Sequence, residues 1–328
     1  MREDQDYFAL WASLMVACVK SGVRIKIIHN VDREGEEMID AIKGWLPLYI
    51  SGLIEPYVFR KESNARFCCT MFLRTDGACI HGFFPVGSGD KRWYDYITDK
   101  DRLDLLYQQY SMMISTATPL LKTYTAAMSN AFRELCGDSP WTGASLLTDL
   151  PVVTMPEDML ARMLVRAEID ENKTTELLSL YRDMRDCFNR NMKMSDVNMI
   201  LCPSGKEAAQ SRRVNFSLDL LDLALEYTPE EYSEHVDAVM KLVEQEKNFH
   251  LTLLPDAPFR DIQIVTLGDA LAVLRCREPC AAFVFLNPML TESVSDYLGA
   301  LIEQFSEDRH ATAEALEKLK TPDTSQAE

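Results

Sequence analysis

The stretch from residue 67 to residue 86 places the strongest constraint on the fold. It contains two apolar runs, Phe67–Leu73 and Ala78–Phe84, joined by Arg74-Thr75-Asp76-Gly77. Asp-Gly between two strand-like runs is a strong hairpin signal, because both residues tolerate the positive φ that a tight turn requires. We therefore expect an antiparallel hairpin that turns at Asp76.

Size and composition narrow the class of protein. The 328 residues, 47% of them apolar, suffice for two modest domains or one pseudo-symmetric domain. The net charge of −17 argues against direct binding to a nucleic-acid backbone, which requires clustered Lys and Arg. Nine cysteines without framework spacing and the lack of a signal peptide indicate a reducing cytoplasm. No apolar stretch reaches the roughly 20 residues of a membrane span, so we expect a soluble protein without a membrane partner.

The first unit is predicted to cover residues 1–118. A helical pattern over residues 9–21 ends at Gly22, and a buried strand then leads to His29-Asn30. An amphipathic helix, a strand and the hairpin follow, and the unit closes with a short strand and a helix, at residues 32–49, 54–59, 67–84, 93–97 and 99–115. The N-cap of the last helix is expected at Asp99 or Thr98.

The remaining chain divides into three predicted parts. Residues 119–227 are expected to be a helical and irregular connecting region that Pro140, Pro151 and Pro156 interrupt. Within it we expect two helices over residues 158–192, joined near Asp170, and a strand at Val197–Leu201. The final unit, residues 228–306, opens with Thr228 at the N-cap, Pro at the first helical position and Glu231 at the third. A strand, a second hairpin around Asp269, another strand and a helix follow, at residues 248–254, 262–275, 281–286 and 288–305. Residues 307–328 are predicted to be a flexible tail.

Both ends of the chain share the order helix, strand, hairpin, strand, helix, which resembles half of a phospholipase D-like domain. Active enzymes of that family carry His-x-Lys-x-x-x-x-Asp on the first hairpin strand. Alignment of the Asp with Asp76 puts the His position at Cys69 and the Lys position at Met71. On the second hairpin the His position falls at Ile262 and the Lys position at Ile264. The resemblance implies an α/β fold of two phospholipase D-like half-domains, pseudo-duplicated mixed sheets flanked by helices with a helical insertion between them, that has lost its nucleophile.

A more specific resemblance is carried by four short sequence segments, Gly22–Arg33, Trp45–Tyr57, Tyr227–His235 and Asn248–Phe259. They resemble the bacterial XRE-type helix-turn-helix transcriptional regulators. In that family a DNA-binding domain precedes a long regulatory region, whereas no helix-turn-helix precedes Tyr7 here. The resemblance implies a regulatory region that meets DNA only through a helix-turn-helix domain not in this chain. Its expected partners are a small-molecule effector and a second copy in a homodimer.

The candidate ligand site lies at the end of the first strand. Ligands of open α/β sheets gather beyond the carboxyl ends of strands, where His29 and Asn30 are expected. Arg33 follows at the start of the next helix, a position that favours an anion. His81, on the second hairpin strand, is expected to reach the same cleft. The alternative is structural: His29 packed at a strand end and His81 half-buried in its strand.

The sequence offers little support for a catalytic nucleophile or a metal site. Apolar neighbours raise the pKa of a thiol such as Cys69, which favours an inert core residue over a nucleophile. Cys276 and Cys280 lack the second ligand pair that zinc requires. We therefore expect no catalytic residue, metal or cofactor. Two alternatives stay open: a divergent phosphodiesterase that uses other residues, and a ligand-free interaction scaffold if no pocket joins His29, Arg33 and His81.

Overall fold

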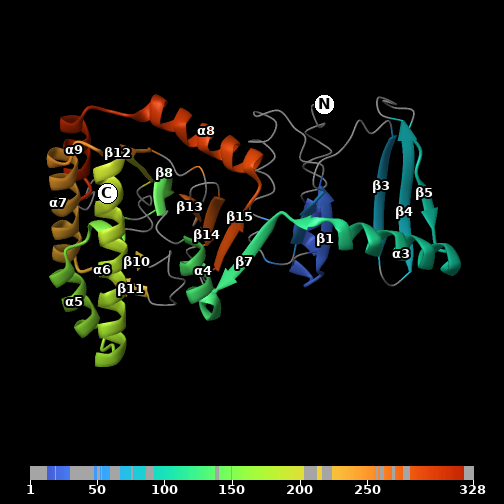
Figure 1. Cartoon of the computed structure of the whole chain (residues 1–328), viewed down its shortest axis with the longest axis horizontal. Helices are drawn as coiled ribbons and strands as arrows, with labels where there is room; N and C mark the ends of the chain where they lie inside the picture. The colour runs from blue at the N-terminus through green and yellow to red at the C-terminus, as the bar shows by residue number, and fades with distance from the viewer. Residues whose placement is uncertain are drawn as a thin grey trace, which may run out of the picture. The chain divides into compact units, whose positions relative to one another are not determined.

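The structure, a computed structural model, shows a mixed α/β protein (Figure 1). It describes residues 13–18, 20–29, 48–49, 52, 54–59, 67–74, 77–85, 92–136, 140–148, 150–202, 213–215, 224–255, 258, 262–267, 270–275 and 281–320. The described chain divides into two compact units, one up to Leu120 and one from Leu121 onward. The predicted α/β class is confirmed at this level.

A three-stranded sheet in the first unit has the order β1-β2-β6. Its strands are β1 (Ile25–His29), β2 (Ile54–Val58) and β6 (Thr118–Pro119). β1 and β2 are parallel, whereas β6 runs antiparallel to β2. The carbonyl of Pro56 accepts a hydrogen bond from the Leu120 N–H at 2.8 Å. Proline has no N–H to return, so the ladder between β2 and β6 ends there.

The predicted hairpin is confirmed. β3 (Phe67–Arg74) and β4 (Ala78–Pro85) pair antiparallel along their whole length. Gly77 has a φ of +129° and donates its N–H to the Arg74 carbonyl at 3.3 Å, which closes the turn. Asp76 itself lies outside the described residues. β5 (Asp95–Ile97) pairs with β4 in a second three-stranded sheet, and α3 (Lys100–Thr116) follows with Asp99 as its N-cap.

The second unit is built on a seven-stranded mixed sheet with the order β12-β9-β8-β13-β14-β15-β7. β12, β9 and β8 are parallel neighbours, and the other pairings are antiparallel. The strands are β7 (Leu121–Thr125), β8 (Pro140–Leu147), β9 (Val197–Leu201), β12 (Phe249–Leu253), β13 (Ile262–Leu267), β14 (Ala270–Arg275) and β15 (Ala281–Phe285).

Three of these strands come from residues 119–227, the segment predicted to be a helical and irregular connecting region. β7, β8 and β9 join the same sheet as the strands after residue 228. The segment also contains α4 (Ser129–Cys136), α5 (Glu157–Arg166), α6 (Glu171–Met194) and the paired strands β10 (Arg213–Asn215) and β11 (Ala224–Glu226). Pro140 is predicted to interrupt a helical region, whereas in the structure it begins β8; proline is compatible with the first position of a strand.

Helices cover both faces of the seven-stranded sheet (Figure 1). One face and the helices on it form a continuous apolar core, whose strand residues include Leu147, Val197, Met199, Leu201, Phe249, Leu251, Val265, Ala272, Leu274, Ala282 and Val284. Alternate strand residues point to the opposite face, where Leu146, Ile200, Ile264, Val273 and Phe283 are also buried. α8 (Pro288–Phe305) contacts β8, β12 and β14. The unit therefore has a helix–sheet–helix arrangement.

The described strands do not confirm the predicted duplication. The hairpin β3–β4 belongs to a three-stranded sheet, whereas β13–β14 lies inside the seven-stranded sheet. An Asp-Gly turn specifies which two strands pair locally, but it does not specify which strands their outer edges join.

Residues 307–320 correct the prediction of a flexible tail. They contain α9 (Arg309–Glu317), capped by the Asp308 side chain, and Leu316 is fully buried in the core. The Arg309 guanidinium donates to the carbonyls of Glu246 and Lys247 at 2.9 and 2.6 Å, and so satisfies the end of α7 (Pro229–Gln245). An Ala-, Glu- and Lys-rich composition suits a surface helix as well as a tail. Residues 321–328 lie outside the described part.

Replacement of Leu316 by Ala should therefore destabilise the second unit by about 2 to 4 kcal/mol, because it leaves a cavity in a packed core. The free energy of unfolding from urea denaturation measures the effect. The control Glu314→Ala, an exposed position on the same helix, should change it by less than about 0.5 kcal/mol. Equal stability of Leu316→Ala and the unsubstituted chain would contradict the packing of α9.

Candidate functional site

The structure places the first predicted site residue at the end of β1. His29 is the last residue of this strand and lies opposite Val58 of β2. Because β1 and β2 are parallel, their carboxyl ends share one edge, as the sequence argument requires. Asn30 and Arg33 fall outside the described residues. The ligand role of these three residues therefore stays a prediction.

His81 belongs to a different sheet from His29. It is half-buried in β4, opposite Met71 of β3 and Asp95 of β5. The structure thus brings together His81 and Met71, the position at which the sequence resemblance predicts the Lys of a phospholipase D-like motif. Cys69 lies two residues before Met71 on β3 and pairs with Phe83 of β4.

The corresponding positions of the second hairpin are plain core residues. Ile262 and Ile264 are both buried in β13. In the described part of the chain, no group of three or more His, Cys, Asp or Glu side chains could hold a metal ion. Of the described helices, none combines the length and apolarity that crossing a bilayer requires.

A groove with convergent polar groups lies elsewhere, over η2 (Val152–Thr154) and between α6 and α7. Local sequence signals fix these helices. The Asp170 side chain accepts the Lys173 N–H at 2.9 Å and starts α6. Thr228 and Glu231 form the predicted capping box that starts α7.

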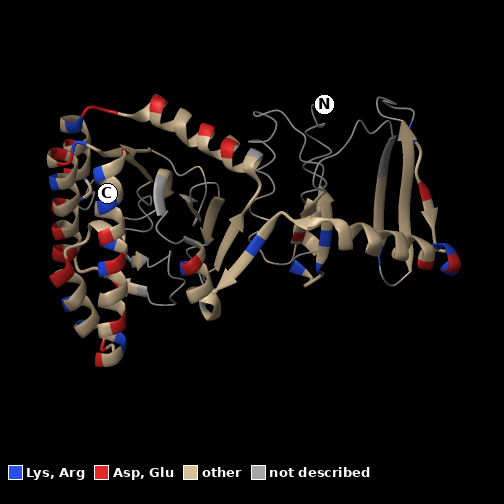
Figure 2. Cartoon of the chain, in the orientation of Figure 1, with Lys and Arg blue, Asp and Glu red and all other residues tan. Residues whose placement is uncertain are grey.

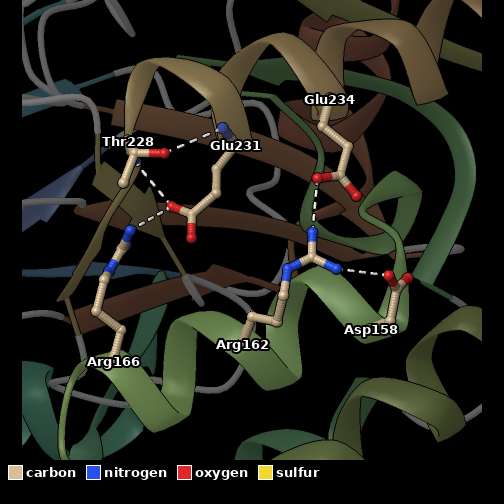
Figure 3. Close-up of polar contacts among 6 residues, drawn as sticks. All are labelled: Asp158, Arg162, Arg166, Thr228, Glu231 and Glu234. Carbon is tan, nitrogen blue, oxygen red and sulfur yellow. Dashed lines mark hydrogen bonds and ion pairs between the residues drawn. The ribbon is translucent and has the colours of Figure 1, made fainter.

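Ion pairs connect α5 to the first turns of α7 (Figure 3). Arg162 on α5 contacts Asp158 on its own helix and Glu234 on α7, both at 2.6 Å. Arg166 contacts Glu231 at 2.7 Å, so this carboxylate both caps α7 and pairs with α5. Exposed pairs such as Arg162–Glu234 contribute little stability individually.

Buried and half-buried residues form the floor of the groove, whose accessible surface is more polar than apolar. Val153, Thr154 and Phe188 are buried, and Ala238 and Leu242 are half-buried on the facing side of α7. The groove encloses about 290 Å³. That volume is near the lower end of the roughly 300 to 1,000 Å³ typical of small-molecule sites.

The rim carries the polar groups. Arg185 and Asn189 come from α6, and Lys241, Gln245 and Glu246 come from the second half and end of α7. Acidic and basic residues are interspersed along the helices of this unit (Figure 2). At the groove, two cations and one carboxylate leave a formal charge of 2 − 1 = +1 in a chain whose net charge is −17.

Arg185 is held in place at the rim. Its Nη1 donates to the Tyr181 hydroxyl at 2.9 Å, and its guanidinium lies 5.9 Å from the centre of the Tyr181 ring. The Tyr181 hydroxyl in turn donates to the Met155 carbonyl next to η2. The cation is therefore oriented before any ligand arrives, which lowers the entropic cost of binding.

A buried chain of hydrogen bonds lies beneath the floor. Thr154 Oγ1 donates to the Pro151 carbonyl at 2.6 Å, so it accepts from His235 Nε2 at 2.9 Å. In the neutral imidazole, whose proton is then on Nε2, His235 Nδ1 accepts the proton of the Tyr227 hydroxyl at 2.8 Å. Every bond of the chain then has one donor and one acceptor with His235 neutral. Burial lowers its pKa from 6.5 to about 3.

Sequence reasoning missed this groove. Its residues come from three segments, residues 153–156, 185–189 and 238–246, which no local motif connects. Lys241 and Gln245 look like an ordinary solvated helix face. The one usable signal is the Thr228-Pro229-Glu230-Glu231 cap, which fixes the start of α7 and hence the side of the helix that faces inward.

No profile of a known protein family matches the chain, and no curated protein matches it. Among solved structures it is similar to the archaeal chromatin protein TrmBL2, whose structure is described as showing a novel mode of DNA binding. The two chains are 8% identical, and the match covers 73% of this chain and 76% of that one with a TM-score of 0.29. Similarity at this level establishes no shared fold and carries no functional conclusion.

The buried histidine predicts acid sensitivity. Below pH 6.5 the unfolded chain binds a proton at His235 that the folded chain does not bind until about pH 3, so folding becomes less favourable as the pH falls. The contribution approaches about 1.4 kcal/mol per pH unit between roughly pH 6 and pH 4. Urea denaturation at several pH values measures it.

His235→Asn should lower stability at pH 7 by about 1 to 3 kcal/mol and remove this part of the pH dependence. The matched control His250→Asn, at an exposed histidine beside Asp196, should retain it. An unchanged pH profile in His235→Asn would contradict the neutral buried state.

Proposed function

We propose that the chain is a non-catalytic, effector-binding region of a bacterial transcriptional regulator, and that a small anion in the groove between α6 and α7 is its effector. The observation that carries the proposal is that two cations, the oriented Arg185 of α6 and Lys241 of α7, line one groove. Support for a regulatory role comes from the four sequence segments that resemble XRE-type regulators. In this proposal DNA is contacted by a helix-turn-helix partner domain, and the region acts as a homodimer.

The scaffold is, in the same proposal, a phospholipase D-like fold kept for its shape. Cys69 and Met71 stand where the active enzymes carry His and Lys, and the hairpin that presents them is intact. The helix and strand order at the two ends of the chain is the support for a second half-domain. Residues His29, Asn30, Arg33 and His81 remain candidates for a further ligand contact in the first unit.

An effector can change the state of a regulator only if it binds two conformations with different affinity. The groove suits that role because its walls belong to separate elements. Thr154 of η2 contributes to the floor and is bonded to His235 of α7. A ligand that draws α6 and α7 together over η2 therefore stabilises one arrangement of these three elements.

Isothermal titration calorimetry with inorganic phosphate and with short carboxylates tests anion binding. Lys241→Gln should weaken binding about tenfold, because it removes one charge-assisted contact. The matched control Lys193→Gln, an exposed position in the last turn of α6 outside the groove, should leave the affinity unchanged. Equal weakening by both substitutions would mean that the anions respond only to net charge, and the groove would not be the site.

A non-catalytic role predicts that the purified chain does not hydrolyse bis(4-nitrophenyl) phosphate above the background rate. Cys69→Ala and His29→Ala should make no difference to that result. Hydrolysis that persists through purification and disappears in either variant would replace the regulator by the alternative, a divergent phosphodiesterase. The ligand-free scaffold becomes the better alternative if no anion binds at all.

A further inference from the structure

The register between α6 and α7 determines which polar groups of the groove lie at the same height. Both helices lead into neighbouring parallel strands, β9 and β12, so the two helices run in the same direction. Near their C-terminal ends the Asn248 side chain donates to the Met192 carbonyl at 2.8 Å. Residues at equal distances before Met192 and Asn248 therefore lie at similar heights, with about 1.5 Å of rise per residue.

This register gives the groove two polar levels. Arg185 of α6 and Lys241 of α7 each lie seven residues before the hydrogen-bonded pair, so the two cations share one level. The amides of Asn189 and Gln245 each lie three residues before it, about 6 Å further along the helices. Glu246 follows at the end of α7. The positive charges of the groove are therefore at one level, and its negative charge lies beyond the amides.

Both cations have donors left for a ligand. The hydrogen bonds of Arg185, to the Tyr181 hydroxyl and the Met155 carbonyl, use only Nη1. Its Nε and Nη2 have no partner among the described residues, and this side of a guanidinium offers two parallel N–H groups to the two oxygens of a carboxylate. Lys241 likewise forms no hydrogen bond or ion pair within the part of the chain that the structure describes.

Glu246 supplies the opposite charge. Its backbone is already engaged, because its N–H donates to the Leu242 carbonyl and its own carbonyl accepts from Arg309. Its carboxylate, in contrast, binds no cation among the residues whose placement is described. An ammonium group of a ligand would form a charge-assisted hydrogen bond there, and the amide oxygens of Asn189 and Gln245 can accept its other N–H groups.

We infer that the groove binds an acidic amino acid, whose two carboxylates and one ammonium complement the two cations and one carboxylate of the rim. The carboxylates bind Arg185 and Lys241, and the ammonium binds Glu246. A dicarboxylate without the ammonium would bring a like charge to Glu246, in a chain whose net charge is already −17. The inference rests on the proposed function, a small anion in this groove, and adds the chemical class of the effector.

Calorimetry with L-glutamate, glutarate and L-glutamine tests the class. Glutarate lacks the ammonium, and L-glutamine carries an amide in place of the second carboxylate. We expect L-glutamate to bind at least about tenfold more tightly than either, because each of the others loses one charge-assisted contact. Equal or tighter binding of glutarate or L-glutamine would overturn the inference.

The same titrations separate the inference from the proposed function. If inorganic phosphate or short carboxylates bind in the groove and L-glutamate does not, the inference fails and the proposed function stands. If none of these compounds binds, both fail.

The variant Glu246→Gln tests the position of the ammonium. It should weaken L-glutamate about tenfold and leave glutarate unchanged or tighter, because it removes the partner of the ammonium and a charge that repels the dianion. The matched control Glu244→Gln makes the same change of charge at an exposed position of α7 outside the groove, and it should retain the preference for L-glutamate. Urea denaturation verifies that both variants fold. Loss of the preference in both variants, or in neither, would contradict the inference.

Discussion

The second unit depends on covering a sheet that is apolar on both faces. Its strands bury side chains on alternating sides, so neither face can meet water. α8 covers one face, and the other face packs into a core that includes residues of η2, α5, α6, α7 and α9. The positions of these helices are therefore consequences of the sheet. The groove lies over η2 between α6 and α7.

A second constraint holds that helical layer in one arrangement. The hydrogen bonds from Tyr227 through His235 and Thr154 to Pro151 run through the core, where an unmade bond costs far more than in water. They connect the start of α7 to η2, while ion pairs nearer the surface connect α5 to α7. The groove thus has a rigid base beneath walls that meet solvent. This combination suits a site that binds a ligand and reports its presence.

The sequence predicted local structure well wherever a local cause acted alone. The hairpin turn at Gly77, the Asp99 cap of α3 and the Thr228 capping box of α7 each follow from a few neighbouring residues. The two helices on either side of Asp170 were also predicted. The sequence-based prediction failed where a residue type or a local composition is compatible with two different structures. Pro140 begins a strand instead of interrupting a helical region, and residues 309–317 form a packed helix instead of a tail.

What the sequence determined by itself is the set of elements and their ends, because turns and caps are satisfied by residues a few positions apart. It also determined the acidic charge and the absence of His and Lys from the phospholipase D positions. Only the tertiary structure decided which strands share a sheet and which side chains meet. Arg185, Lys241 and Thr154 lie far apart in the chain, and only the packing of α6 and α7 on one sheet face brings them to one groove.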